Sequence, residues 1–353
     1  MEKFGEGPDI LEWQLPFSVV EALLVDHSTD GSIRWCTADY EKLFGKGLGF
    51  GENEEIKAEL LVDKNHPVIR PRFIKCREEQ RQRSVEKAEV FTPSWVCNKQ
   101  NNLVDAAWFG AKSSPFSREI DRKDGTHGWT TSHGRIKFPK SKSWWDYLLA
   151  NRLEVSCGEA PYLTSRYDSV SGDVIAPCDR IGLLDRKLRV LTECGPKTPD
   201  AWFALAKLAV SRCYGFDWQG DNVLLARENV LFAVIEAFNE AFNYEGLFTE
   251  KAMLELAEII GWNIWQMDGI KFVVPNTCES EVARKQALAP KQGEFLVDVK
   301  ADKKPPQRIC KGCKSGKVAE HEGIRCRVMD WETGKPVLFM PPFKFEPIEE
   351  GAR

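Results

Sequence analysis

The sequence predicts an α/β fold built around a mainly parallel β-sheet. Between residues 143 and 278, short apolar segments alternate with longer segments in which apolar residues recur every three or four positions. Such alternation is typical of βαβ units, in which a helix connects two parallel strands. Three of the apolar segments also carry an acidic residue near their carboxyl ends, which a parallel sheet brings to one edge.

The 353 residues are expected to divide into three regions. Residues 1–142 form an N-terminal helical region, and residues 143–278 form the sheet-containing core. Residues 279–353 comprise a linker rich in Lys, Pro and Gln, a small cysteine-rich lobe and the final strands of the core.

Within the N-terminal region the sequence predicts helices separated by polar turns. The predicted helices are 18–26, 38–44, a charged helix at 77–89, and a helix that begins at Thr92, Pro93 and Ser94 and continues to Trp108. Residues 110–142 are rich in Gly, Ser, Lys and Pro, so we expect a long exposed loop.

Within the core the predicted strands and helices follow one another in order. The predicted strands are LEVSC (153–157), YGFDW (214–218), NIWQM (263–267) and KFVV (271–274). The predicted helices are 143–152, 179–193, 198–214, 221–242 and 249–261. We expect the first strand to lie centrally, beside the strands that end at Asp217 and Asp268.

Charge is segregated along the chain, although the net charge is only −4. Residues 1–60 carry 13 acids and 5 bases. Three later stretches are basic, each with only 3 acids: there are 8 Lys or Arg in 64–87, 8 in 112–142 and 10 in 284–317. Three basic stretches on an acidic chain indicate a local anion-binding surface, which suits the DNA backbone. The alternative is that each stretch is a solvated loop.

The sequence also carries information on the cellular compartment of the protein. No run of 18 apolar residues occurs, so we expect no membrane span. The N-terminus is acidic and lacks an apolar signal segment, so a cytoplasmic protein is expected. The eleven cysteines are unevenly spaced, which favours reduced thiols over a disulfide framework.

Three acids mark the carboxyl ends of the predicted strands: Glu154, Asp217 and Asp268. Small residues follow the first of them, in the segment Cys157-Gly158-Glu159-Ala160. A nucleoside-bearing cofactor needs a small-residue loop for close backbone approach, an acid for its ribose hydroxyls and a polar group for its base. Each acid taken alone has an alternative role as a helix cap or a surface charge.

Four segments resemble motifs of adenine-specific DNA methyltransferases. LEVSCGEAPYL (153–163) resembles motif I, YGFDWQGDNVLLARENVL (214–231) resembles motif II, and NIWQMDG (263–269) resembles motif III. KAEVFTPSWVCNKQNNLV (87–104) resembles the Phe-Thr-Pro element of the methylation (M) subunits of restriction–modification systems. The order of the four is that of these subunits, and it implies a Rossmann-like sheet that binds S-adenosylmethionine.

The resemblance implies roles for individual residues. The methionine part of S-adenosylmethionine would lie between two groups of residues. The group above it would be Phe91, Thr92 and Pro93, and the loop beneath it would contain Glu154, Cys157, Gly158 and Ala160. Asp217 would hold the ribose hydroxyls and Asp268 the adenine amino group. Trp218 and Ile270 would flank the adenine ring, although core packing is an equally good role for Trp218.

The sequence departs from the family pattern at the catalytic signature, Asn/Asp/Ser-Pro-Pro-aromatic, which is absent. The nearest match is VLFMPPF (337–343), in which Pro341, Pro342 and Phe343 follow Met340 in place of the acceptor. The alternative for these prolines is a plain turn. The other candidate is VMDW (328–331), with Asp330 as hydrogen-bond acceptor and Trp331 as a platform for the extruded base.

Cysteines gather near the end of the chain. Cys310, Cys313, His321 and Cys326 lie within seventeen residues, and a Cys-x2-Cys pair with an internal glycine suits a tetrahedral metal. We expect one structural zinc ion; the alternative is free thiols on a basic loop.

These patterns together predict a cytoplasmic S-adenosylmethionine-dependent DNA methyltransferase of restriction–modification type. It would act on the N6 amino group of a flipped adenine. Its sequence specificity would come from residues 1–142, from residues 276–330, or from a specificity or restriction subunit as partner. One alternative is a catalytically silent nucleic-acid-binding protein with the same fold. Another is a methyltransferase for RNA or protein.

Overall fold

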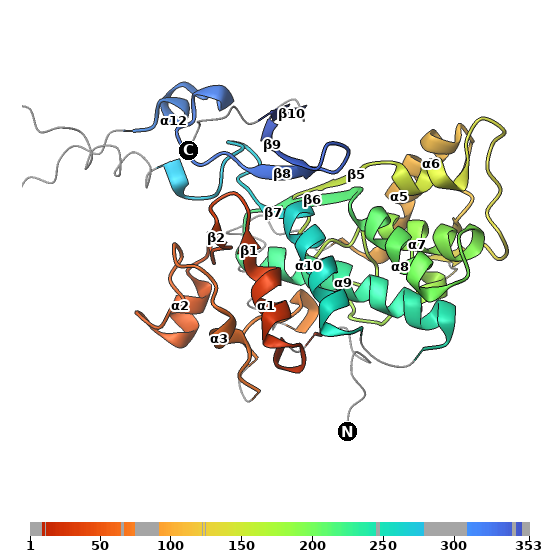
Figure 1. The fold of residues 1–353 in the computed structure, drawn as a ribbon, viewed down its shortest axis with the longest axis horizontal. Helices are drawn as coiled ribbons and strands as arrows, with labels where there is room; N and C mark the ends of the chain where they lie inside the picture. Colours follow the sequence, from red (N-terminus) through yellow and green to blue (C-terminus); the bar gives the residue numbers. More distant parts are fainter. Residues whose placement is uncertain are drawn as a thin grey trace, which may run out of the picture.

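The computed structural model describes residues 9–10, 12–64, 67–74, 92–121, 123, 125–244, 248–278, 309–340 and 344–347. These residues form a mixed α/β structure with small sheets, one of which is parallel. Helices lie on one side of the parallel sheet and an antiparallel sheet lies on the other (Figure 1). The described part contains no helix that is both long and apolar enough to cross a membrane.

The parallel sheet has the order β5 (Arg152–Val155), β6 (Cys213–Asp217) and β7 (Ile264–Gln266). All five residues of β6 are buried, whereas β5 alternates buried and exposed residues. The prediction that the first strand lies centrally is therefore wrong, because β6 occupies the centre and β5 an edge. The reason is composition: β6 can bury both faces, while Leu153 and Val155 of β5 stay partly exposed.

Side chains of the sheet alternate between two hydrophobic cores. Cys213 and Ile264 belong to the main core, which the helices share. Tyr214, Phe216 and Trp265 belong to a second core on the opposite face.

Helices cover the main-core face. They are α6 (Trp144–Leu149), α7 (Leu183–Cys194), α8 (Pro199–Val210), α9 (Gly220–Phe242) and α10 (Glu250–Asn263). Helix α9 contacts both β6 and β7. All five agree with the helices that the sequence predicts in the core, apart from small differences at their ends.

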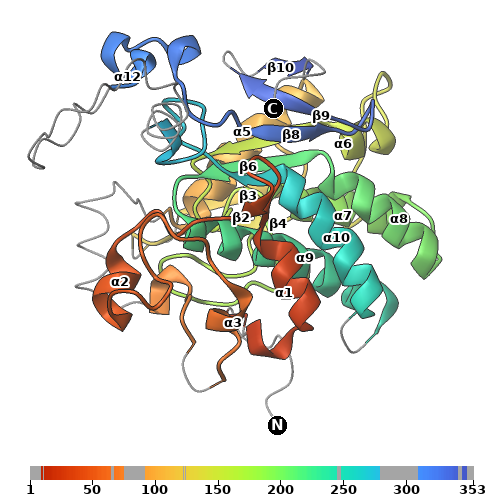
Figure 2. The same cartoon turned by 60° about the vertical axis from the view of Figure 1, so that its left-hand side comes forward.

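The N-terminal region packs on the same helices. It contains η1 (Glu12–Gln14), α1 (Phe17–Leu24), β1 (Val25–Asp26), β2 (Gly31–Ser32), α2 (Asp39–Phe44), α3 (Ala58–Leu61) and η2 (Arg72–Ile74). Helix α1 lies against α10 and α9, as Figure 2 shows from a second side. Val19 and Trp35 share the main core with Trp202 and Leu224, so the described residues before 70 and the sheet region have one common core. Phe109, Phe116 and Ile136 belong to a separate cluster with Tyr147 and Val190.

Helix α5 (Ser94–Phe109) begins directly after Pro93, as the sequence predicts. A hairpin of β3 (Ser117–Asp121) and β4 (His127–Thr131) follows it. The expectation of a loop through 110–142 is wrong at this point. The hairpin buries only Ser117 and Thr131 among its ten residues, so its hydrophobic pattern is too weak to mark strands.

The C-terminal part holds the second sheet. Its described elements are α12 (Lys311–Ser315), η4 (Val318–Glu320), β8 (Arg327–Asp330), β9 (Lys335–Met340) and β10 (Lys344–Pro347), in the antiparallel order β10-β9-β8. Phe339 packs on Trp265, with 4.9 Å between ring centroids. The predicted strand at KFVV is absent from these described residues, where Val273 makes only isolated bridges to Asp268 and Arg325.

Candidate functional site

A cleft of about 1130 Å³ opens at the carboxyl ends of the three parallel strands. Glu154, Asp217 and Asp268 all line it: Glu154 lies in β5, Asp217 ends β6, and Asp268 follows β7 after one residue. The predicted convergence of the three acids is therefore confirmed. Such a position, outside the ends of parallel strands, is where α/β sheets bind ligands.

The loop after β5 turns tightly beneath the cleft. Ser156, Gly158 and Ala160 all have φ between 51° and 60°, the left-handed conformation that glycine adopts most easily. The backbone N–H of Cys157 donates to the Phe216 carbonyl at 2.8 Å, which attaches the loop to β6. Ala160 adopts this conformation despite its methyl group.

Glu154 holds the far end of that loop. Its carboxylate accepts hydrogen bonds from the backbone N–H groups of Tyr162 (3.2 Å) and Leu163 (3.0 Å). Burial raises the pKa of Glu154 to about 8. Glu154 therefore acts on the shape of the cleft by fixing residues 156–163.

Asp217 occupies the middle of the cleft. Its Oδ2 accepts from the Gly158 N–H at 2.9 Å, and its Oδ1 accepts from the Gln219 N–H at 3.0 Å and from Asn222 Nδ2 at 3.1 Å. Burial raises its pKa, and these hydrogen bonds oppose the rise. A carboxylate can accept roughly four hydrogen bonds, so Oδ2 retains capacity for a ligand hydroxyl.

Asp268 closes the turn at the other end of the cleft. Its Oδ1 accepts from the N–H groups of Ile270 (2.9 Å) and Lys271 (3.0 Å). The Lys271 ammonium lies 3.4 Å from Oδ2. The Ile270 side chain is 83% exposed although it lines the cleft, and Trp218 lines it as well.

The N-terminal region forms the opposite wall, which the sequence did not predict. Residues 36–39, Lys42, Glu52 and Arg72 line the cleft together with Thr92. No motif marks residues 36–39, and the basic stretch containing Arg72 suggested a DNA surface instead. The signal that was available is the position of Arg72 between Pro71 and Phe73, in a segment that also contains the apolar residues Val68, Ile69 and Ile74.

Arg72 brings a positive charge to the small-residue loop. Its Nη1 lies 3.8 Å from the point where a Cβ on Gly158 would sit. Its charge opposes the rise in the pKa of Asp217. Its backbone N–H donates to Glu159 Oε1 at 2.6 Å, which links the N-terminal region to the loop.

The Phe-Thr-Pro segment is described from Thr92 onward. Thr92 lines the cleft, and its carbonyl accepts from Ser169 Oγ at 2.7 Å. Pro93 precedes α5 and is not among the lining residues, and Phe91 lies outside the described residues.

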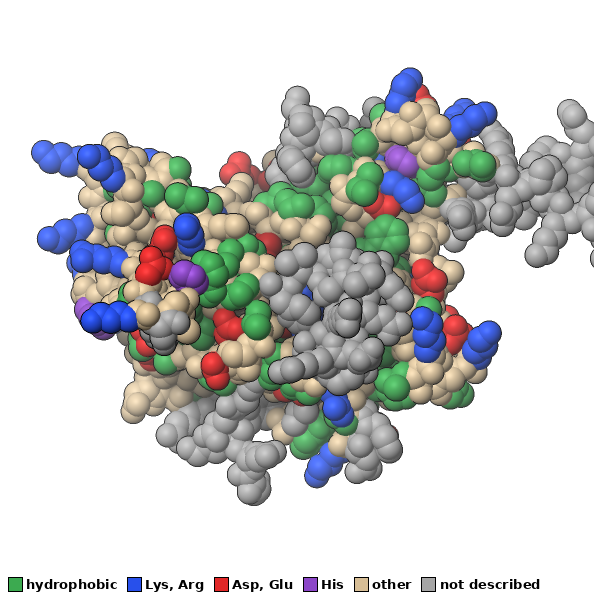
Figure 3. Space-filling model, turned by 180° about the vertical axis from the view of Figure 1, so that it is seen from behind, with side chains coloured by type: hydrophobic (Ala, Val, Ile, Leu, Met, Phe, Trp, Pro, Cys, Tyr) green, Lys and Arg blue, Asp and Glu red, His purple; other side chains and the backbone are tan. Residues whose placement is uncertain are grey.

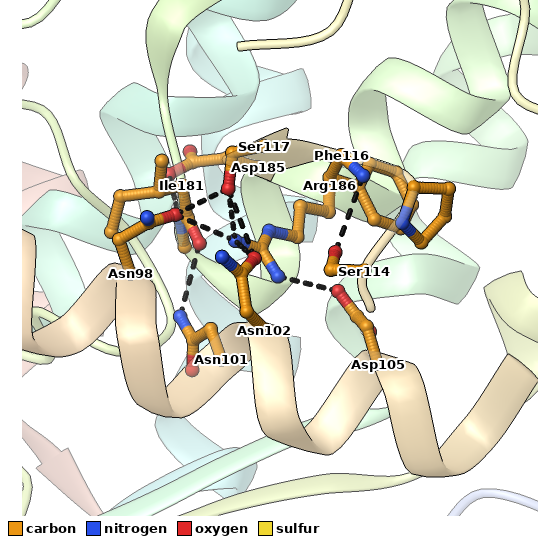
Figure 4. A network of polar contacts seen from close by, with 12 residues as sticks. Asn98, Asn101, Asn102, Asp105, Ser114, Phe116, Ser117, Ile181, Asp185 and Arg186 are labelled. Carbon is orange, nitrogen blue, oxygen red and sulfur yellow. Dashed lines mark hydrogen bonds and ion pairs between the residues drawn. The ribbon is translucent and has the colours of Figure 1, made fainter. Parts of the chain in front are cut away.

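A buried polar network anchors α5 behind the cleft (Figure 4). The Arg186 guanidinium donates to Asp105 Oδ2 at 2.5 Å and to the side-chain oxygens of Asn98 (3.0 Å) and Asn102 (2.9 Å). Asn101 donates to the carbonyls of Tyr162 and Ile181, and Tyr162 belongs to the loop region. The network thus fixes the helix whose start brings Thr92 to the cleft.

The structure does not bring the predicted catalytic residues to the cleft. Asp330 accepts from Glu332 N–H and Thr333 Oγ1 within its own turn, and Trp331 Nε1 donates to Asn263 Oδ1 at 2.7 Å. Asn263 precedes β7, so this turn lies at the amino ends of the parallel strands. The prediction that Asp330 and Trp331 face the cleft is therefore wrong, because the chain through β8 runs from Cys326, beside Gln266 at the carboxyl end of β7, to Trp331, beside Asn263 before its amino end. Pro341, Pro342 and Phe343 lie outside the described residues.

A second cluster has the donors of a metal centre. The ligand atoms of Cys278, Cys310, Cys313 and His321 all lie within 4.8 Å of one another. The three sulfurs are 3.8, 3.8 and 3.6 Å from His321 Nδ1. Tetrahedral zinc with Zn–S bonds of about 2.3 Å and Zn–N bonds of about 2.0–2.1 Å requires S···N separations of roughly 3.6 Å. The four residues therefore fit zinc as they stand.

One predicted ligand is wrong. Cys326 is fully buried in the second core, where its thiol donates to the Gln266 carbonyl at 3.5 Å. Cys278 takes the fourth position in the cluster. It lies 32 residues before Cys310, and a search for closely spaced cysteines does not find it.

Close backbone packing shapes the cluster. A Cβ on Gly312 would lie 2.4 Å from the backbone nitrogen of His321, so only glycine permits this approach. The Glu322 N–H donates to Cys310 Sγ at 3.2 Å, an interaction that stabilises a thiolate.

The basic stretches are described in part. The exposed Lys and Arg residues described within 112–142 are Lys112, Arg118, Lys123, Arg135, Lys137 and Lys140. Figure 3 shows several Lys and Arg side chains close together at one edge of the molecule. Lys142 instead donates to the Trp108 carbonyl and lies over its ring at 4.5 Å. Only residues 64, 67–74 and 309–317 of the other two stretches are described.

Comparison with protein families, characterised proteins and solved structures found no match for this chain. An assignment of function therefore depends on the geometry of the cleft and the metal centre.

Proposed function

We propose that the chain binds S-adenosylmethionine in the cleft and serves as an adenine-N6 DNA methyltransferase with a Rossmann-like sheet. One observation carries this proposal: three parallel strands deliver Glu154, Asp217 and Asp268 to one cleft that also contains a left-handed small-residue loop. Packing alone does not require three acids at three successive strand ends.

The chemistry of the lining residues matches the parts of the cofactor in order across the sheet. Asp217 would accept hydrogen bonds from the ribose hydroxyls. Asp268, Ile270 and Trp218 would surround the adenine. Arg72, beside the Gly158 loop, would pair with the carboxylate of the amino-acid end. When bound, S-adenosylmethionine supplies an electrophilic methyl group.

Transfer to an exocyclic amine also needs a hydrogen-bond acceptor near that methyl group. The segment of Pro341, Pro342 and Phe343 remains the candidate that the sequence offers. A second function, a catalytically silent platform for nucleic-acid binding, is favoured by the position of Asp330 and Trp331 at the far end of the strands. Incubation with methyl-labelled cofactor and duplex DNA, RNA or protein separates these functions. A methyltransferase transfers the label to one of the three substrates, whereas a catalytically silent protein transfers it to none.

Asp217→Asn is expected to weaken S-adenosylmethionine binding about 30-fold or more. The amide removes the negative charge and one acceptor from a group placed for two ribose hydroxyls, and charged hydrogen bonds contribute about 1.5–3 kcal/mol each. Isothermal calorimetry with S-adenosylmethionine and its demethylated product measures the change. The matched control is Asp330→Asn, the same substitution at the other end of the strands, which should bind normally. Equal affinities for the wild type and Asp217→Asn would overturn the cofactor assignment.

Lys137→Gln combined with Lys140→Gln is expected to weaken duplex DNA binding and to lower the slope of log K against log salt by about 2. Both side chains are exposed, whereas Lys142 is left unchanged because it packs on Trp108. Fluorescence anisotropy at several salt concentrations measures the slope. The control variant, Lys46→Gln with Lys251→Gln, removes the same amount of charge from exposed positions outside the basic stretches. It should leave the salt-dependence slope unchanged. Salt-independent binding would contradict the proposed DNA surface.

A further inference from the structure

We infer that the metal centre is a clamp on the base-binding wall of the cleft, so that metal loading strengthens binding at the adenine end of the cofactor. This wall is the segment 267–274, of which residues 267–271 line the cleft. The cofactor part of the inference rests on the proposed function; the clamp itself does not.

The wall and the metal centre share one short segment of chain. Only three residues separate Cys278 from the end of the wall, whereas the other three ligands come from 310–321. Figures 1 and 2 show α12, which contains Cys313, near the chain that leaves β7. A metal ion bound by all four ligands would therefore tie the end of the wall to the C-terminal lobe.

Backbone contacts continue this connection along the wall. Val273 pairs with Arg325 in an antiparallel bridge. The Val274 N–H donates to the Ile324 carbonyl at 2.8 Å, and the Ile324 N–H donates to Thr277 Oγ1 at 3.0 Å. Three successive contacts thus run from the metal ligands toward the cleft.

Arg325 joins the two sites directly. Its guanidinium donates to the carbonyl of the ligand His321 at 3.1 Å and to the carbonyl of Lys271, in the cleft wall, at 3.4 Å. It also donates to the carbonyls of Val318 (2.9 Å) and Ala319 (3.0 Å) beside the metal centre. We therefore assign Arg325 as a positioning residue for the wall.

The wall also has supports on the sheet side, where the Met267 N–H donates to the Asp217 carbonyl at 2.9 Å and Phe272 and Val274 belong to the second core. Its own hydrogen bonds close the turn from Asp268 to Val273, and these fix its shape rather than its place. Ile270, at the tip, is 83% exposed. The contacts behind the wall, which the metal ligands organise, therefore add to the sheet and core contacts in fixing the position of Asp268 and of the exposed tip.

The first test compares zinc-loaded and chelator-treated full-length protein. Calorimetry with S-adenosylhomocysteine should give at least 10-fold weaker binding without metal, restored by adding Zn²⁺. The loaded protein should also prefer S-adenosylhomocysteine over its hypoxanthine analogue, and removal of metal should reduce that preference. Loss of base discrimination reports on the wall in particular, because general destabilisation would weaken both ligands equally.

The second test needs no cofactor. Hydrogen exchange of the backbone N–H groups in 268–274 should quicken at least 10-fold on metal removal. Arg325→Ala, checked by elemental analysis to retain its zinc, should show the same quickening and the same loss of base discrimination. Arg327→Ala is the matched control, because Arg327 contacts Ser28 and Asp30 instead.

The outcomes separate the two proposals. Unchanged exchange in both the metal-free protein and Arg325→Ala would overturn the clamp. If the zinc-loaded protein binds neither ligand, the proposed function fails, while quickened exchange would still support the clamp. Equal affinities with and without metal, in a protein that does bind S-adenosylhomocysteine, would overturn the coupling of metal to cofactor.

Discussion

Replacement of Cys310 by serine is expected to lower bound zinc from about one ion per chain to nearly none. Cys310 is one of three sulfurs within 3.8 Å of His321 Nδ1, and its sulfur accepts the Glu322 N–H that stabilises a thiolate. A serine hydroxyl stays protonated near neutral pH and is a poor zinc ligand. Structural zinc binding contributes about 10–16 kcal/mol in small zinc domains when all ligands are present. Loss of one of the four ligands removes a large share of this binding energy, so the ion should be released. Elemental analysis of protein purified without added metal measures the stoichiometry.

Cys326→Ser is the matched control for this substitution. Cys326 lies close to the cluster in sequence, and the sequence pattern alone makes it a ligand. In the structure its thiol contacts the Gln266 carbonyl and Cys278 completes the cluster, so Cys326→Ser should keep its zinc. Retention of zinc by Cys310→Ser, or its loss from Cys326→Ser, would contradict the assignment.

The parts of the fold that the sequence predicts correctly are those with strong local patterns. Helix α5 starts directly after Pro93, α8 and α10 bury residues at helical spacing, and α7 and α9 carry long runs of consecutive buried residues. The three acids were found because a carboxylate directly after an apolar segment is a local feature as well. Their meeting in one cleft then follows from parallel strand direction alone.

The features that the sequence did not predict depend on contacts between distant segments. Cys278 reaches its partners across 32 residues, and Arg72 reaches the Gly158 loop across 86 residues, so neither lies in a recognisable spacing. The direction of β8 decides that Asp330 faces away from the cleft, and a sequence pattern carries no information on strand direction. The β3–β4 hairpin buries too little apolar surface to produce an alternating pattern.

The buried network behind the cleft is one of these long-range features, and it should dominate stability. Asp105 is fully buried and lies among three partners: Arg186 at 2.5 Å, the Tyr147 hydroxyl at 2.8 Å and Arg152 at 3.6 Å. Among the described residues, Asp105 is the one carboxylate that forms an ion pair with Arg186 and Arg152. The network connects α5, α6, α7 and β5, which together hold the cleft loop.

Asp105→Ala is therefore expected to lower the free energy of unfolding by about 3–5 kcal/mol, because it leaves two buried guanidinium groups without their anion. The neutral oxygens of Asn98 and Asn102 still accept from Arg186, but they cannot balance its charge. Urea unfolding followed by circular dichroism measures the loss. The matched control is Asp121→Ala, which removes a carboxylate paired with His127 on the surface and should cost less than about 1 kcal/mol. A loss below about 1.5 kcal/mol for Asp105→Ala would mean that water or the asparagines compensate Arg186, and that the network orients α5 without stabilising the fold.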